Sequence, residues 1–249
     1  MAVSKWSYPM PHKELARVLS KRGIASRKAA SQWIREGRVR VNGRVVRDPL
    51  LIVDINETDI RVDGKPTAAA PHLYYMLNKP RGLVTTARDE QGRDTVYKCF
   101  DPPLPAWVFP VGRLDKASEG LLLFTNDTDW ANGLTDPASH LPKSYHVQVH
   151  PCPNEKLVSA LLKGIVTGEN EPLRCAEASI LRLGDKNGWL EISLTEGKNR
   201  QIRRMLEALE FKVLRLIRVA IGPLRLGKLA KGAARALTPS EAAQLTVRR

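Results

Sequence analysis

The chain has 249 residues, of which 43% are hydrophobic, so it is long enough to bury one or two sizeable cores. Forty Lys and Arg against 26 Asp and Glu leave a formal net charge of +14. This excess favours a polyanionic partner, because each neutralised phosphate releases condensed counterions. The absence of any run of eighteen apolar residues excludes a membrane-spanning helix, and residues 1–11 hold no signal-peptide core. We therefore expect a cytoplasmic protein without a membrane partner.

Cysteine and histidine spacing argues against a metal site. Cys99, Cys152 and Cys175 are odd in number and far apart, which fits neither a zinc site nor a disulfide framework. His146 and His150 are four residues apart but alternate with valines, as in a strand, so a shared metal is a weak interpretation. The sequence also lacks a phosphate-cradling glycine loop and a Gly-x-Ser-x-Gly motif. We expect no metal and no small-molecule cofactor.

Most of the net positive charge lies near the N-terminus, where residues 12–47 carry eleven Lys and Arg against two Glu. Apolar residues at helical spacing predict a helix that Gly23 can end, and Ser26 can cap a second helix that ends at Gly37. Asn42-Gly43 follows alternating Val and Arg and is a strong type I′ hairpin signal. The predicted order is helix, helix, hairpin.

Two stretches of this region, Arg22-Gly-Ile-Ala-Ser-Arg-Lys-Ala and Gly37-Arg-Val-Arg-Val-Asn-Gly, resemble the small RNA-binding domain first described in ribosomal protein S4. We place this domain at residues 12–62. Charged helix residues are often merely solvated, and phosphate contacts orient RNA without reading its sequence. The resemblance implies that six residues face the RNA backbone: Ser26, Arg27, Lys28, Arg35, Arg38 and Arg40.

Residues 63–72 are short of large apolar side chains and contain two prolines, which predicts a linker before a second domain at residues 73–249. This second domain begins with a β-prone run from Leu73 that closes at Asn78-Lys79-Pro80-Arg81-Gly82. An ordinary strand and turn would explain these residues without any function. Lys79 and Arg81 can also add to an RNA-binding surface.

The stretch 112–127 reads Gly-Arg-Leu-Asp-Lys-Ala-Ser-Glu-Gly-Leu-Leu-Leu-Phe-Thr-Asn-Asp. It places Asp115 near Arg113 and just before an apolar run, 121–124, that predicts a core strand. A carboxylate at such a position can be a nucleophile held by fixed neighbours. Taken alone, however, an Asp after a Leu is usually an exposed turn residue or a helix cap.

An alternating strand is predicted from Lys143, with Tyr145, Val147 and Val149 on one face. The ring and hydroxyl of Tyr145 suit a site that needs both stacking and a polar group. A tyrosine at the start of a strand is nevertheless more often a residue at the edge of a core.

The stretch 194–206 contains Arg-Gln-Ile-Arg-Arg-Met, and apolar residues recur from Ile202 at the spacing of one helix face. Arg203 falls on the border of that face, so its stem can pack while its guanidinium reaches a carboxylate. Arg200 and Arg204 point further from the core and suit phosphate better. Near the end of the chain, Thr238-Pro-Ser-Glu forms a capping box for a last short helix.

The stretches around Lys79, Asp115, Tyr145 and Arg203 together resemble the pseudouridine synthases, specifically the RsuA and RluB type that act on ribosomal RNA. The resemblance implies an α+β protein in which a small helix-helix-hairpin RNA-binding domain precedes a catalytic domain with a mostly antiparallel mixed sheet. It also implies RNA contacts from Lys79, Arg81, Arg113, Lys198, Arg200 and Arg204.

The resemblance assigns roles to three residues. Asp115 would be the catalytic nucleophile, Tyr145 would stack on the target base and help to move a proton, and Arg203 would hold Asp115. The residues leave open whether Asp115 attacks ribose C1′ or removes a ribose proton. A uridine stacked within RNA would be flipped into the pocket, as other enzymes that act on bases require.

The expected reaction isomerises a specific uridine of ribosomal RNA, for which we favour a large-subunit (23S) precursor bound by a monomer. The Gly23–Gly43 region looks closest to the large-subunit branch, although the small-subunit (16S) enzymes share the same motifs. A non-catalytic RNA-binding or ribosome-assembly factor would explain the charge equally well. Asp115, Tyr145 and Arg203 together discriminate between the two, since pure binding does not require them.

Overall fold

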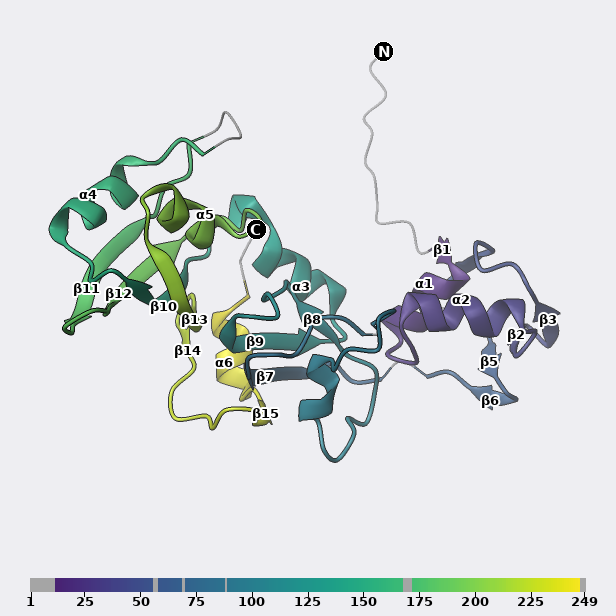
Figure 1. Ribbon diagram of the computed structural model, residues 1–249. Helices are drawn as coiled ribbons and strands as arrows, with labels where there is room; N and C mark the ends of the chain where they lie inside the picture. Colours follow the sequence, from purple (N-terminus) through teal and green to yellow (C-terminus); the bar gives the residue numbers. More distant parts are fainter. Residues whose placement is uncertain (1–11, 56–57, 69, 88, 168–171, 247–249) are drawn as a thin grey trace, which may run out of the picture. The chain divides into compact units, whose positions relative to one another are not determined.

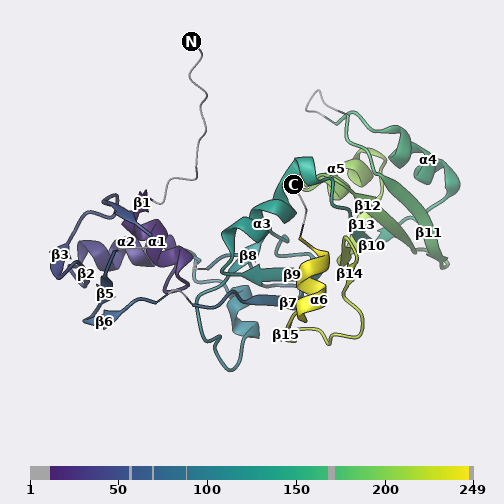
Figure 2. The same ribbon diagram turned by 180° about the vertical axis from the view of Figure 1, so that it is seen from behind.

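The computed structural model describes residues 12–55, 58–68, 70–87, 89–167 and 172–246. The chain divides into two compact units (Figures 1 and 2). The first extends to Leu73 and includes Leu104–Phe109 and Asn126–Thr128, and the second holds the remaining residues. In the described part of the chain, no helix is long and apolar enough to cross a bilayer.

The first unit combines two short helices with short strands. Its elements are β1 (His12–Glu14), α1 (Leu15–Lys21), α2 (Arg27–Arg35), β2 (Val39–Val41), β3 (Arg44–Val46), β4 (Ile52–Asp54), β5 (Ile60–Val62) and β6 (Lys65–Pro66). One sheet has the order β3-β2-β5-β6, and β1 pairs with β4. Apolar residues of both helices, including Leu15, Leu19 and Ile34, form a core with Val39 and Ile60 from the sheet.

The predicted helix ends and hairpin of this unit are confirmed. Gly23 and Gly37 follow the two helices with φ values of +70° and +77°, in the left-handed region that glycine adopts most readily. Ser26 caps α2, because its side-chain oxygen accepts a hydrogen bond from the backbone N–H of Ala29 at 3.2 Å. Asn42 and Gly43 both have positive φ between β2 and β3, as a type I′ turn requires.

The segment predicted as a linker is integrated into the first unit. Lys65–Pro66 forms β6 on the edge of the sheet, and Thr67 is buried. The guanidinium of Arg22 donates to the carbonyl and hydroxyl oxygens of Thr67, both at 2.9 Å, and to the carbonyl of Ile55. This segment is therefore not a flexible linker despite its low apolar content, because its main-chain groups and the Thr67 hydroxyl form hydrogen bonds within the first unit.

The second unit contains a large mixed sheet with helices packed on it. Its strands are β7 (Tyr74–Lys79), β8 (Phe109–Val111), β9 (Glu119–Thr125), β10 (Lys143–His150), β11 (Glu177–Leu183), β12 (Gly188–Leu194), β13 (Lys212–Ile221), β14 (Leu224–Arg225) and β15 (Ala234–Ala236). Its helices are η1 (Val96–Cys99), α3 (Thr128–Thr135), η2 (Pro137–Ser139), α4 (Glu155–Lys163), α5 (Gln201–Ala208) and α6 (Pro239–Gln244). The strand order is β11-β12-β10-β13-β9-β7-β15, and the expected α+β fold with a mostly antiparallel mixed sheet is confirmed.

Two helices cover one half of this sheet. Leu157 and Leu161 of α4 and Met205 of α5 join a buried cluster with Val147 of β10 and Leu190 of β12. Figure 1 shows α4 and α5 beside the β10–β12 part of the sheet. The apolar helix face predicted from Ile202 onward is thus confirmed as a core contact. Strand β9, predicted from the run 121–124, is buried along its whole length.

The two halves of the sheet meet where β9 and β13 pair in parallel, at Glu119↔Ile217 and Gly120↔Arg218. Gly120 has a φ of +100°, and a Cβ atom there would collide with the carbonyl oxygen of Arg218. Only glycine fits this junction without displacing a strand. The junction brings the chain that follows Asp115 beside β13.

A buried carboxylate reinforces the junction. The side chain of Glu119 is 3% exposed and accepts two hydrogen bonds of 3.0 Å from Arg215. It also forms an ion pair with Lys231 at 2.5 Å. Burial raises the pKa of the Glu119 carboxyl, but the hydrogen bonds from Arg215 and Lys231 outweigh it, so the pKa lies below its ordinary value of 4.5. Glu119 therefore stabilises the fold above pH 4.5, and this contribution is lost as pH falls through the lowered pKa.

We expect Glu119→Gln to reduce the free energy of unfolding by about 2 kcal/mol at pH 7, because charge-assisted hydrogen bonds are lost. The difference from wild type should shrink as pH falls from 4.5 through the lowered pKa of Glu119, because the native carboxyl then becomes neutral as well. Denaturant titrations at pH 7 and pH 3 measure it, with the exposed Glu177→Gln as the control. A deficit that is equal at both pH values would contradict an ionised Glu119.

Candidate active site

A cavity of about 360 Å³ opens beside the β9–β13 junction. It is lined by the chain before β9, the start of β10, the turn before α5, and the inner part of β13. Its volume lies at the lower end of the range for small-ligand sites. Asp115, Tyr145, Arg200 and Arg203 all line it, so the structure brings the sequence-predicted catalytic residues into one pocket.

The loop that carries Asp115 is held by its main chain. The ammonium of Lys79, at the end of β7, donates to the carbonyl oxygens of Pro80, Asp115 and Ser118 at 3.1, 3.1 and 2.8 Å. The backbone N–H of Gly82 donates to the carbonyl of Lys116 at 2.8 Å. These contacts fix the loop without using the Asp115 side chain, which is left to face the cavity.

The expectation that Lys79 faces RNA is wrong. Its side chain is fully buried, at 0% exposure, because all three of its N–H donors are used by carbonyls around the Asp115 loop. Burial lowers the pKa of this ammonium to about 8, while the charge of Asp115 acts in the opposite direction. Lys79 is a residue that positions the loop and has no surface to offer a phosphate.

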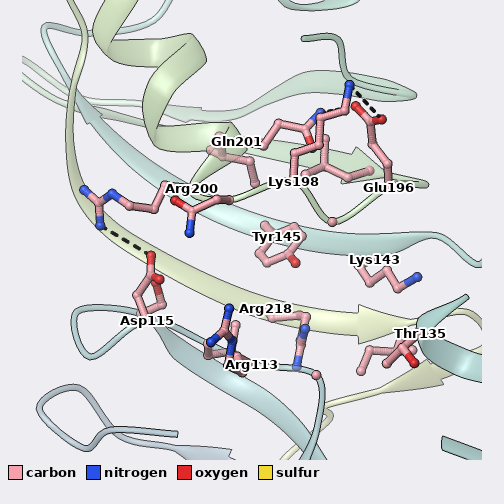
Figure 3. Close-up of a pocket in the computed structure, with 18 of the residues that line it drawn as sticks. Arg113, Asp115, Thr135, Lys143, Tyr145, Glu196, Lys198, Arg200, Gln201 and Arg218 are labelled. Carbon is pink, nitrogen blue, oxygen red and sulfur yellow. Dashed lines mark hydrogen bonds and ion pairs between the residues drawn. The ribbon is translucent and has the colours of Figure 1, made fainter. Parts of the chain in front are cut away.

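Two arginines approach the Asp115 carboxylate. The Nη1 of Arg200 donates to Oδ2 at 3.5 Å (Figure 3). The Nε of Arg203 lies 3.9 Å from the same oxygen. The Arg203 side chain is 13% exposed, against 50% for Arg200 and 39% for Asp115. Arg203 is therefore the buried cation of the group, and its charge is less screened by solvent than that of Arg200.

Arg203 comes from the first turn of α5, with its stem beside the core face. Its Nη2 reaches the carbonyl of Ala117 at 3.4 Å, and its Nε is buried without a hydrogen-bond partner among the described residues. Burial and the neighbouring charge of Arg200 lower the pKa of the Arg203 guanidinium, and the charge of Asp115 opposes this. A small approach of Asp115 would satisfy the unpaired Nε.

Arg200 was assigned to phosphate from its helix position, but the structure places it against Asp115. It lies immediately before α5 with a φ of +47°, so the helical spacing used to orient it does not apply. Tyr145, near the start of β10, lines the same cavity. Figure 3 shows Tyr145 between the Asp115–Arg200 pair and Lys143.

The other basic residues expected to contact RNA lie in different surroundings. Arg81 and Arg113 are exposed, and Arg113 lines the cavity. Lys198 also lines it and lies 3.4 Å from Glu196. Arg204 turns away and donates to Thr167 at 3.0 Å.

In the first unit, five of the six residues expected to face RNA are exposed: Arg27, Lys28, Arg35, Arg38 and Arg40. Ser26 is partly buried by its capping role. Arg38 forms a hydrogen-bonded pair with Asp63 at 3.0 and 2.6 Å and stacks on Trp33, so its charge is partly committed within the unit. Arg27 and Arg35 project from the two ends of α2.

Comparison with known proteins identifies the second unit. The family model described as RNA pseudouridylate synthase matches residues 73–208, slightly more than half of the chain. The chain belongs to the RNA pseudouridine synthase family. The S4 domain model matches residues 15–60, so this pseudouridine synthase carries an S4 domain at its N-terminal end.

Similar proteins cover nearly the full length of this pseudouridine synthase. The "Ribosomal large subunit pseudouridine synthase B" of Bacillus subtilis is 39% identical over 234 residues, covering 93% of this chain and 94% of the relative. An uncharacterised RNA pseudouridine synthase of Aquifex aeolicus is 43% identical over 230 residues, covering 91% of each chain. A crystal structure of a pseudouridylate synthase superposes with a TM-score of 0.66 at 32% identity, covering 94% of this chain and 99% of the other.

Two further residues of the synthase pocket were missed in the sequence. Arg218 of β13 and Lys143 of β10 both line the cavity (Figure 3). Arg218 is an arginine within the apolar run Ile217–Ile221. Buried strands rarely contain charged residues, so this pattern could have indicated a functional role for Arg218. Lys143 gave no comparable signal, because a lysine at the start of a strand is ordinary.

Proposed function

We propose that this synthase converts a uridine of large-subunit ribosomal RNA into pseudouridine, with Asp115 acting at the ribose, Tyr145 contacting the base and Arg203 holding Asp115. The observation that carries the proposal is the convergence of Asp115, Arg203 and Tyr145 on one cavity. A binding factor would have no use for a carboxylate in the middle of a basic RNA-binding surface, because a carboxylate repels phosphate.

The reaction breaks the bond between ribose C1′ and uracil N1 and joins C1′ to C5. Asp115 can attack C1′ or remove a ribose proton as the base leaves. Either role needs a carboxylate fixed in position, and two cations lie 3.5 and 3.9 Å from it. The Asp115 loop is held by Lys79, so the carboxylate is aimed before the substrate arrives.

The target uridine would enter the cavity flipped out of its stack, and the aromatic ring of Tyr145 suits contact with the base. Basic residues around the cavity and on the S4 domain would then bind the RNA backbone. We propose as backbone contacts Ser26, Arg27, Lys28, Arg35, Arg38, Arg40, Arg81, Arg113, Lys198, Arg200 and Arg204.

The large-subunit assignment rests on the similarity to the Bacillus subtilis protein named for that subunit. We expect a strain lacking this gene to lose one pseudouridine from large-subunit ribosomal RNA. Chemical mapping of both ribosomal RNAs tests this, with restoration by the wild-type gene as the control. Loss of a small-subunit site, with the large subunit unchanged, would move the target to the small-subunit RNA.

We expect removal of exposed charge from α2 to weaken RNA binding and flatten its salt dependence. In the double variant Arg27→Ala/Arg35→Ala, each lost phosphate contact should lower the slope of log K against log salt by about 0.9 on duplex RNA or about 0.7 on single strands. Alanine maintains helix propensity, so the S4 domain should stay folded. Filter binding between 50 and 300 mM salt measures the slope. Arg182→Ala, on an exposed part of β11, removes one charge outside the S4 domain and is the control. An unchanged slope in the double variant would show that α2 does not contact RNA.

A further inference from the structure

Arg218 carries a buried positive charge that no carboxylate neutralises among the described residues. The residue is 6% exposed, and its Nε donates to the carbonyl of Leu121 at 2.7 Å. Its Nη2 is buried and has no hydrogen-bond partner within the described ranges of the chain. A buried charge without a counter-ion reduces the stability of the fold. Its presence at this cavity therefore indicates that Arg218 interacts with a negatively charged group of the substrate.

A second cation lies close to this guanidinium. Lys143 begins β10 and lines the same cavity. Burial and, to a smaller extent, the positive charge of Arg218 lower the pKa of the Lys143 ammonium. Neither side chain forms an ion pair with a carboxylate in the part of the chain described. Two unpaired cations at one end of a cavity make that end attractive to an anion.

The position of Arg218 distinguishes between the parts of a nucleotide that could supply the anion. Arg218 lies directly opposite Tyr145 in the β10–β13 register, and Figure 3 shows it on the strand that passes beneath the Tyr145 ring. A flipped nucleotide enters with its base first, while its phosphates stay with the RNA chain at the mouth of the cavity. The exposed Arg113 is placed for those phosphates, and the buried Arg218 is placed for the base.

We infer that Arg218, assisted by Lys143, stabilises the negative charge of the uracil as it leaves ribose C1′. This inference rests on the proposed function and adds an electrostatic role at the base to the role of Asp115 at the sugar. A preorganised cation in a site of low dielectric stabilises charge that develops only in the transition state.

The step balances without a redox partner. The C1′–N1 bond breaks with its electron pair remaining on uracil, where the charge spreads over N1 and the carbonyl oxygens. Arg218 stays protonated throughout. The uracil anion turns, and its C5 supplies the pair that forms the new bond to C1′, while Asp115 either leaves C1′ with the electron pair of the bond it had formed or returns the ribose proton it had removed. The proton on C5 is then lost and N1 gains a proton, so the product is an isomer of the substrate.

The first test compares Arg218→Met with Arg218→Lys on a uridine-containing RNA fragment under single-turnover conditions. Methionine fills the volume without charge, so we expect thermal stability to be unchanged or higher and the rate to fall about 100-fold, the size of effect typical of losing one transition-state hydrogen-bond donor. Lysine should recover part of the rate. The RNA affinity of both variants should stay within a few fold of wild type. Arg182→Met loses the same charge at a distant exposed position and should retain the wild-type rate.

The second test replaces the target uridine with 5-fluorouridine, whose electron-withdrawing fluorine makes the base a better leaving group. If Arg218 stabilises the leaving uracil, the rate ratio of wild type to Arg218→Met for cleavage of the C1′–N1 bond should be smaller on this RNA, whose C5 carries no proton for the final step. An equal ratio on both RNAs, a folded Arg218→Met enzyme with the wild-type rate, or a loss confined to RNA affinity would overturn the inference. Failure of the wild-type protein to convert uridine in any ribosomal RNA would instead overturn the proposed function.

Discussion

Replacing Asp115 with Asn is expected to abolish pseudouridine formation and to leave RNA binding nearly intact. The amide keeps the shape of the side chain but removes the charge that attacks C1′ or accepts a proton. Because the loop is held through main-chain carbonyls by Lys79, the substitution should not disturb its conformation. We expect the single-turnover rate to fall at least about 10⁴-fold, as when a residue that reacts directly with substrate is removed.

The measurement is pseudouridine formation in a ribosomal RNA fragment under single turnover, with RNA affinity measured in parallel. Asp136→Asn is a matched control, since Asp136 lines the same cavity but its carboxylate caps η2 by accepting from the N–H of Ala138 at 2.9 Å. Asparagine can provide the same cap, so this variant should remain active. Turnover retained in Asp115→Asn would remove Asp115 from the reaction.

Arg203→Ala is expected to lower the rate about 100-fold, and Arg200→Ala about 10-fold or less. Both arginines lie within 4 Å of the Asp115 carboxylate, but only Arg203 is largely buried, where charge is poorly screened. Loss of the buried partner should leave the carboxylate misplaced relative to the ribose. The single-turnover rate at saturating RNA measures this effect, because differences in RNA affinity then do not contribute.

Arg204→Ala serves as the control on the same helix, because Arg204 binds Thr167 and not Asp115. It should keep the wild-type single-turnover rate at saturating RNA, with any loss confined to RNA affinity. If Arg200→Ala lowered the rate more than Arg203→Ala, the exposed Arg200 would be the functional partner of Asp115. Wild-type rates in both variants would mean that the carboxylate needs neither.

Local patterns predicted the elements whose causes are local. The cap at Ser26, the hairpin at Asn42-Gly43 and the capping box at Thr238 depend on neighbours a few residues away, and all three are present. The buried strand after Asp115 and the core face of α5 follow from apolar spacing in the same way.

Contacts between distant segments could not be obtained from such patterns. Lys79 was expected at the surface because its partners, the carbonyls of Asp115 and Ser118, are brought to it only by the pairing of β7 with β9. The approach of Arg200 to Asp115 depends on a left-handed residue before α5, and the burial of Arg218 depends on the parallel contact of β13 with β9. In each case the sequence shows a basic residue but does not indicate which distant segment it contacts.

The missing side chain at Gly120 has a consequence for how far this pocket can vary. With no Cβ between them, the main chains of β9 and β13 touch, so the separation between the strand leading from Asp115 and the strand carrying Arg218 is a backbone dimension. Such a dimension does not change when a side chain adopts another rotamer. Residues around the mouth of the cavity can therefore be exchanged to accept a different RNA stem or loop, while the spacing between the sugar end and the base end of the pocket stays constant.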